Sequence, residues 1–303
     1  MDIFGIFKRA WDITWKYKGL WVLGILANCS GGNGGGSGNA GRSVEYRMSG
    51  DDFPQFQQWV NSVPEETWTT IGIGIGLGLL LLALLLLVLS TIGNGGLIAG
   101  FRMADSNQTV TLGRAFKEGG RHFWKLLAIQ VIPVILSLLL LVPLFLGFAT
   151  IGALTAGIGL LCLIPLFCLV VPAGILISIY IQITQIALVN DDLSIGEAFS
   201  KAWELVRAQP GNILIMALVL GIGNFIAGLA LAAPFFLMAI PFLISAVGSG
   251  DTASTANLSV LLIGSLVYMP ILLLLGGILR TFITGTWTLT YREMTATSEL
   301  PAS

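Results

Sequence analysis

Long apolar stretches recur along the chain, separated by shorter polar segments. Five of them contain no charged residue, and each approaches or exceeds the roughly 20 helical residues that cross the hydrocarbon core of a bilayer. They are Ile71–Ile92, Leu126–Thr150, Leu160–Ile181, Ile213–Val247 and Leu258–Leu279. A sixth, Leu20–Cys29, is too short to cross unless the residues before it are partly immersed, so a re-entrant or half-inserted first helix is also compatible with the pattern. The pattern predicts an all-α, polytopic membrane bundle of about six transmembrane helices.

Three polar segments between these runs share one amphipathic pattern. Each opens with a residue type that caps helix N-termini, namely Asp2, Thr111 or Ser194. Apolar or small residues then follow at the same six offsets, which fall on one helical face. We expect three helices at the cytoplasmic interface, with their apolar sides against lipid or the transmembrane helices. The alternative is a linker helix that faces water and packs on the bundle.

Each amphipathic segment leads into a pair of apolar runs. The chain is therefore expected to form a single integral membrane domain, 1–303, built from three helix-pair repeats. The repeat units are about 2–105, 111–190 and 194–293, and an external Gly-rich loop occupies 30–69. Because the first repeat begins at Asp2, we expect the N-terminal segment to be retained and not cleaved as a signal.

Composition and charge add an orientation to this picture. Of the 303 residues, 55% are apolar and only 10% charged, against roughly 25% charged in a soluble domain. Thirteen of the 15 basic residues lie in segments that six crossings place on one side, and lysine and arginine in short loops stay on the cytoplasmic side. We therefore expect a multi-pass protein of the cell membrane, the inner membrane of a bacterium, with both termini cytoplasmic. Its expected partners are membrane lipids and other membrane proteins, and no nucleic acid.

No pattern typical of an enzyme or a metal centre occurs. The long apolar runs contain no Asp or Glu, which argues against a proton relay and against intramembrane proteolysis. The single histidine, His122, follows Arg121 with no second ligand or base nearby in sequence, so a structural role is expected for it. We expect no catalytic, cofactor-binding or metal-binding residues.

Glycines and polar residues mark two kinds of helix contact. The groups Gly72–Gly78 and Gly93–Gly100 have the small-residue spacing that lets helices approach closely. Aligning the three inward-running helices by their cytoplasmic ends stacks six residues in two layers: Ser90, Asn94, Ser178, Gln182, Arg280 and Thr284. These residues either join neighbouring helices by hydrogen bonds or line a polar vestibule where Arg280 meets an anionic headgroup or ligand. Arg280 itself either snorkels to the interface or points inward.

Short motifs carry a resemblance to a known family. The G-x-A-F sequences Gly113–Phe116 and Gly196–Phe199, together with Thr290–Met294, resemble the membrane domain of bacterial glycerophosphodiester phosphodiesterases and related uncharacterised six-helix membrane families. The resemblance implies an all-helical membrane domain. It implies no activity, because the metal-binding His and Glu pairs of such phosphodiesterases are missing from this sequence.

Two functions fit these observations. The first is a non-enzymatic membrane module that binds or moves a lipid or a small molecule. The alternative is a membrane scaffold or accessory subunit that docks partner proteins through its interfacial helices. A polar internal cavity would favour the first function, and an exposed apolar cytoplasmic groove on well-packed helices would favour the second.

Overall fold

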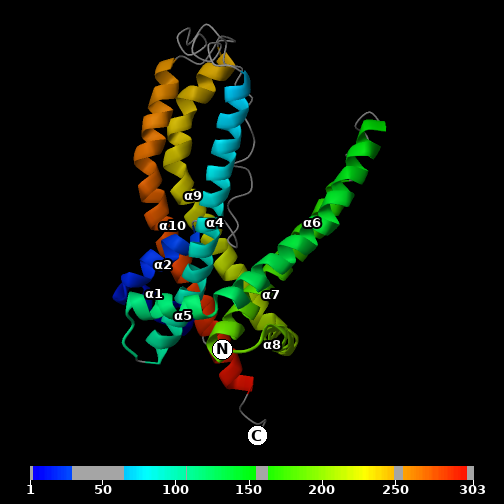
Figure 1. The fold of residues 1–303 in the computed structure, drawn as a ribbon. Coiled ribbons are helices and arrows are strands. Elements are labelled where there is room, and N and C mark those ends of the chain that lie inside the picture. The colour runs from blue at the N-terminus through cyan, green and yellow to red at the C-terminus, as the bar shows by residue number, and fades with distance from the viewer. Residues whose placement is uncertain (1–2, 29–64, 107, 155–162, 249–254, 299–303) are drawn as a thin grey trace.

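The computed structural model describes residues 3–28, 65–106, 108–154, 163–248 and 255–298, and every regular element in these ranges is an α-helix (Figure 1). In chain order they are α1 (Ile3–Lys16), α2 (Gly19–Asn28), α4 (Glu65–Asp105), α5 (Leu112–Arg121), α6 (Phe123–Leu154), α7 (Leu163–Asp191), α8 (Ile195–Ala208), α9 (Pro210–Gly248) and α10 (Thr255–Ser298). Among the described residues, α4, α7, α9 and α10 are long and apolar enough to cross a membrane. The pair α5–α6, bent by 61°, is a fifth candidate. The predicted all-helical character is confirmed for the described residues, and four to five helices that could cross a membrane are compatible with the predicted multi-pass protein.

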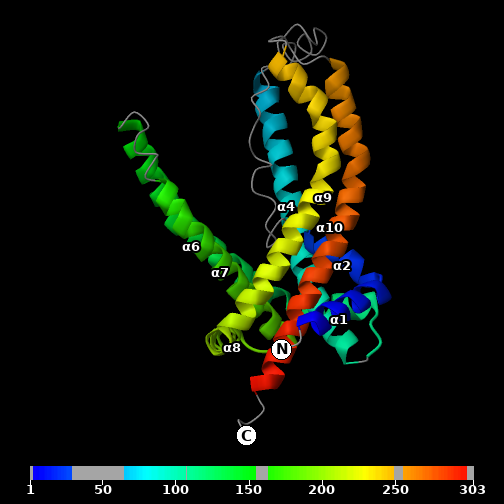
Figure 2. The same cartoon turned by 180° about the vertical axis from the view of Figure 1, so that it is seen from behind.

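The helices form two diverging groups that share one base (Figures 1 and 2). On one side α4, α9 and α10 rise together, and on the other α6 and α7 rise side by side and lean away. The three short helices α1, α5 and α8 lie at the base. Most of the buried core is also there, with fully buried side chains such as Leu23, Leu97, Phe101, Ile186 and Leu188. The rising parts of the helices keep their apolar side chains exposed, as lipid-facing helices do.

The first apolar helix, α2, is only half as long as a spanning helix. Its 10 residues extend about 15 Å, against a hydrocarbon core roughly 30 Å thick. It packs between α4 and α10, where the Thr281 hydroxyl donates to the Leu20 carbonyl at 3.2 Å. A Cβ on Gly24 would overlap the carbonyl of Gly277, so the two backbones are in direct contact. Residues 29–64, which include most of the predicted 30–69 loop, lie outside the described part, and the last five loop residues belong to α4.

The short helices begin where their capping residues predict. Ser194 forms a complete capping box with Glu197, because each side chain accepts a hydrogen bond from the backbone N–H of the other residue. Thr111 stands at the N-cap of α5, but its side chain makes no cap bond. Helix α1 begins at Ile3, directly after Asp2, which is not among the described residues.

Burial repeats along these three helices at fixed distances from the cap. Side chains four and eight residues after it are buried or, at glycine, packed in every case: Ile6 and Ala10, Ala115 and Gly119, Ala198 and Ala202. Larger apolar residues beside them, including Trp11, Phe116 and Trp203, stay exposed. Each helix thus packs on the bundle through small residues and presents an aromatic side chain outward.

Candidate functional site

Arg280 points into the protein from α10. Its side chain is only 9% exposed, and its Nη2 donates a hydrogen bond to Oδ1 of Asn94 on α4 at 3.2 Å. Twelve residues separate it from Arg292, or about 18 Å along a helix. The guanidinium therefore lies well inside an apolar span. Arg280 therefore points inward in this structure and does not snorkel to the interface.

The other predicted inner-site residues divide by helix. Ser90 and Thr284 are buried, like Asn94; the Ser90 hydroxyl donates to the Leu87 carbonyl, and the Thr284 hydroxyl has no hydrogen-bond partner among the described residues. On α7, Ser178 is exposed and donates to its own helix at the Ile175 carbonyl, and Gln182 is half-buried. The structure therefore gathers the α4 and α10 members and leaves Ser178 outside, because α7 leans away with α6.

Buried threonines on α10 were not singled out by the sequence pattern. The hydroxyls of Thr286, Thr288 and Thr290 donate to the carbonyls four residues earlier, at Phe282, Thr284 and Thr286. The Thr281 hydroxyl shares its proton between the Gly277 carbonyl at 2.8 Å and the Leu20 carbonyl at 3.2 Å. Such bonds satisfy a hydroxyl within its own helix. Their signal in the sequence is the alternation of threonine from Thr284 to Thr290, and it indicates packing.

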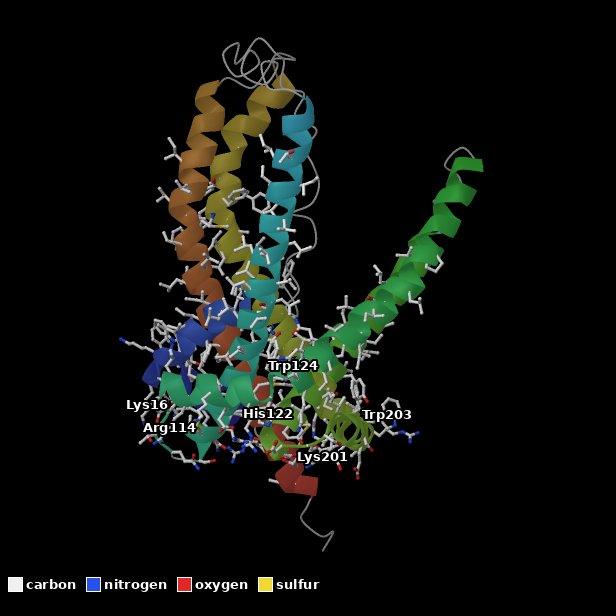
Figure 3. All side chains as sticks on the ribbon, in the orientation of Figure 1. Lys16, Arg114, His122, Trp124, Lys201 and Trp203 are labelled. Carbon is white, nitrogen blue, oxygen red and sulfur yellow. The ribbon has the colours of Figure 1, made fainter. Side chains whose placement is uncertain are left out.

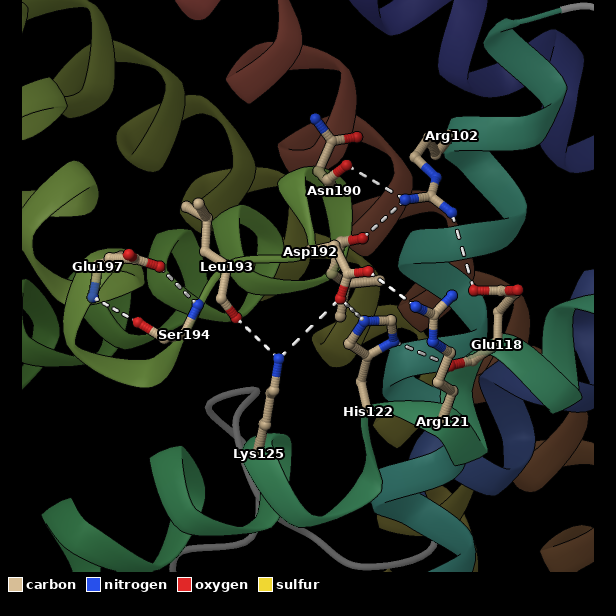
Figure 4. A network of polar contacts seen from close by, with 11 residues as sticks. Arg102, Glu118, Arg121, His122, Lys125, Asn190, Asp192, Leu193, Ser194 and Glu197 are labelled. Carbon is tan, nitrogen blue, oxygen red and sulfur yellow. Dashed lines mark hydrogen bonds and ion pairs between the residues drawn. The ribbon is translucent and has the colours of Figure 1, made fainter.

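A charged network joins the helix ends at the base (Figure 4). Asp192, in the α7–α8 turn at a φ of 54°, pairs with Arg121 at 3.0 Å and with Lys125 at 4.0 Å. His122 Nε2 lies 2.8 Å from Oδ1 of Asp192, and its Nδ1 lies 3.1 Å from the carbonyl oxygen of Glu118. Both ring nitrogens thus lie within hydrogen-bond distance of an oxygen atom. The hydrogen bond from His122, and then the charge of Arg121, lower the pKa of the Asp192 carboxyl.

Further contacts extend this network to α4, α8 and α10. Arg102 donates to the carbonyls of Val189 and Asn190 at 2.9 and 3.1 Å, which satisfies acceptors at the end of α7. Asp191 accepts from Lys201 at 2.6 Å and from the Tyr291 hydroxyl at 2.7 Å. The structural role expected for His122 fits this arrangement. Its partner Asp192 was missed, because 70 residues separate the two in sequence.

Two of the cavities formed by the described residues lie near the base. One, of about 390 Å³ between α1, α4 and α10, contains Asp105, which pairs with Arg9 at 3.5 Å and with Arg292 at 3.0 Å. The other, of about 440 Å³, is a groove between α7, α8 and α9, and apolar side chains form nearly all of its surface. It is lined by Leu176, Ile177, Ile179, Tyr180, Trp203, Val206, Pro210, Ile213 and Leu214. Arg280 lines neither cavity.

The groove ends beside an aromatic and cationic pair on α8. Trp203 is 54% exposed, and the guanidinium carbon of Arg207 lies 5.6 Å from the centre of its ring. The Tyr180 hydroxyl donates to the Phe199 carbonyl at 2.9 Å, so its polar end is already satisfied. The groove therefore has apolar walls, and the Arg207 guanidinium lies beside one of its lining residues, Trp203.

The described residues contain no group of three or more His, Cys, Asp or Glu side chains that could hold a metal ion. Comparison with known proteins gives one match. No curated protein and no solved structure matches the chain, so the resemblance to phosphodiesterase membrane domains stays a prediction. Residues 14–290 match a family described only as a family of unknown function, DUF7544, and the chain belongs to that family.

Proposed function

We propose that the protein is a non-enzymatic module of the cell membrane that binds, or moves, a lipid or small apolar molecule in the groove between α7, α8 and α9. The observation that carries this proposal is the cavity of about 440 Å³ with almost wholly apolar walls. Its volume lies in the range of roughly 300–1,000 Å³ typical of small-molecule sites. Two of its walls, α7 and α9, are candidate membrane spans, so the groove would open toward hydrocarbon.

The base of the molecule is proposed to face the cytoplasm. Lys16, Arg114, His122 and Lys201 all lie at this end (Figure 3), together with the described ends of the chain. Lysine and arginine concentrate on the cytoplasmic side of membrane proteins. Both termini would then be cytoplasmic.

Six crossings in three repeats remain our proposal for the topology. The first would be α2, with the residues before it partly immersed, and the others α4, α6, α7, α9 and α10. Equal burial four and eight residues after each cap supports the repeat. The exposed Trp11 and Trp203 support an interfacial position for α1 and α8, because tryptophan favours the membrane–water boundary.

For the inner polar cluster we propose a joining role, with Arg280 and Asn94 holding α10 against α4. Their mutual hydrogen bond and their burial support this role. A charged side chain in a membrane span is otherwise costly, and pairing with polar neighbours reduces that cost.

Native mass spectrometry of protein purified in a mild detergent tests the groove. We expect the wild-type chain to retain about one lipid or apolar ligand. Val206→Trp should fill the groove and reduce that fraction severalfold, because the indole would occupy the ligand's volume. Leu218→Trp is the matched control: Leu218 is 59% exposed on α9, one turn beyond the groove-lining Leu214.

The outcomes separate the two functional classes. Equal ligand retention in both tryptophan variants would show that the groove is not the site. Retention of a protein subunit in place of a lipid, lost in Trp11→Ala, would favour the scaffold that docks partners through its interfacial helices.

A further inference from the structure

We infer that the groove selects an anionic phospholipid, with one acyl chain between α7 and α9 and the phosphate bound by Arg207. This inference rests on the proposed function and names the ligand class for the same site. The observations that support it are the apolar groove and the Arg207 guanidinium beside the Trp203 ring.

The groove walls suit an acyl chain. Leu176 and Ile177 on α7 and Ile213 and Leu214 on α9 supply aliphatic side chains on two sides, while α8 contributes Val206 and Trp203. A ligand with hydrogen-bonding groups along its length would lose water there without gaining partners. A hydrocarbon chain loses nothing, since it exchanges one apolar contact for another.

Arg207 is the cation available to a headgroup beside Trp203. Lys201, on the same helix, is held by Asp191 at 2.6 Å, whereas no described carboxylate lies within ion-pair distance of Arg207. Glu204, three residues before Arg207, is exposed and pairs with no described cation. A phosphodiester would supply the negative charge that no described carboxylate provides to Arg207.

The Arg207 guanidinium carbon lies 5.6 Å from the centre of the Trp203 ring. A cation–π contact of this kind is not a hydrogen bond, so it leaves the N–H donors of the guanidinium to other partners. Those donors match two phosphate oxygens in a bidentate pair. Tryptophan at headgroup depth and the anionic lipids of a cytoplasmic leaflet agree with this position.

Lipid titration followed by native mass spectrometry tests the inference. Delipidated full-length protein would be titrated with phosphatidylglycerol or with phosphatidylcholine of the same acyl chains. We expect the wild type to bind the anionic lipid about tenfold more tightly, as one charge-assisted pair provides. Arg207→Gln should remove this preference and leave the phosphatidylcholine affinity unchanged, while Arg207→Lys should retain part of it. Arg114→Gln is the control, because Arg114 is an exposed cation on α5 that donates to the Thr109 hydroxyl at 3.0 Å.

Two results would overturn the inference while leaving the proposed function intact. Equal wild-type affinity for both lipids would show that the groove binds chains without reading the headgroup. A preference that survives Arg207→Gln but falls in Arg114→Gln would place the headgroup site elsewhere. If neither lipid binds, or if Val206→Trp binds both as tightly as the wild type does, the groove itself is not a lipid site and the proposed function fails as well.

Discussion

Helix α4 contains two halves of similar composition and opposite surroundings. Its outer half carries Gly72, Gly74, Gly76 and Gly78, and no described residue would come within 4 Å of a Cβ at any of them. In its inner half, a Cβ on Gly95 or Gly96 would press on α5, and one on Gly93 or Gly100 would press on α2. The predicted close approach is therefore confirmed for the second group only.

The difference shows what holds helices together when lipid is the solvent. Burying leucine against another helix gains little over burying it in lipid, so apolarity alone does not join helices. Close backbone contact and polar bonds do. The inner half of α4 has both, because Gly95 and Gly96 meet α5 and Asn94 bonds Arg280. The outer half, from Ile73 to Leu85, has neither among the described residues and stays exposed.

The largest effect is expected from a glycine at the base. A Cβ on Gly119 would meet the backbone of Ile92 and Gly96, which cannot move as a side chain can. We expect Gly119→Ala to lower the free energy of unfolding by about 2–3 kcal/mol. Gly76→Ala should instead raise it, by up to about 1 kcal/mol, through helix propensity. Unfolding of both variants in mixed micelles measures the contrast, and equal effects would remove the distinction between the two halves.

The polar bond of the inner half is expected to contribute next. Asn94→Ala removes an acceptor from a buried guanidinium and should lower stability by about 2 kcal/mol. In a double-mutant cycle with Arg280→Met, the two effects should be less than additive, because both changes remove the same hydrogen bond. Ser178→Ala, at an exposed residue that bonds its own helix, should change stability by under about 0.5 kcal/mol. Full additivity in the cycle would mean that the bond does not join α10 to α4.

Helix capping at the base should give a smaller effect. Ser194→Ala removes one half of a complete capping box and should destabilise by about 1 kcal/mol. Thr111→Ala should have less effect, because the Thr111 hydroxyl makes no cap bond. Thermal unfolding followed by circular dichroism would compare the two. A larger loss at Thr111 would contradict the assigned caps.

The smallest effect is expected from the exposed carboxylate in the α7–α8 turn. Its hydrogen bond with His122 lowers the pKa of Asp192 below the ordinary value of 3.8. A lowered folded-state pKa stabilises the fold above the unfolded-state pKa, and that contribution declines as pH falls through the folded one. The stability difference between wild type and Asp192→Asn should therefore shrink as the pH falls below about 3.9. Melting temperatures at several pH values would show this, and a difference that grew on acidification would refute it.

Local features of the fold were readable from the sequence. Apolar length predicted the helices that are long enough to cross a membrane, α4, α7, α9 and α10. The Ser194–Glu197 spacing predicted a capping box. Both features depend on neighbours within a few helical turns. Both glycine groups of α4 were expected to allow close approach, and their different surroundings depend on which helices lie beside each half, which no local pattern encodes.

Features that depend on helix orientation could not be predicted from the sequence. The position of Arg280 in the sequence was compatible with a side chain that snorkels to the interface and with one that points inward. Only the packing of α10 on α4 decides between the two. The prediction that Ser178 belongs to the inner site assumed that α7 converges with α4 and α10. In the structure α7 leans away with α6 (Figure 1). The groove depends on the angle between α7 and α9, which no local pattern encodes.

The packing of α2 on α10 has a consequence for the order of events during synthesis. The bond between Thr281 and Leu20 spans 261 residues, and Gly24 meets Gly277 over a similar separation. At a translation rate of roughly 5–20 residues per second, the first apolar helix leaves the ribosome on the order of tens of seconds before its partner. During that interval a 10-residue helix, too short to span by itself, has no α10 to pack against. The N-terminal segment therefore completes its tertiary contacts only after the C-terminal helix has been inserted, and a nascent chain truncated before α10 should leave α2 open to proteolysis.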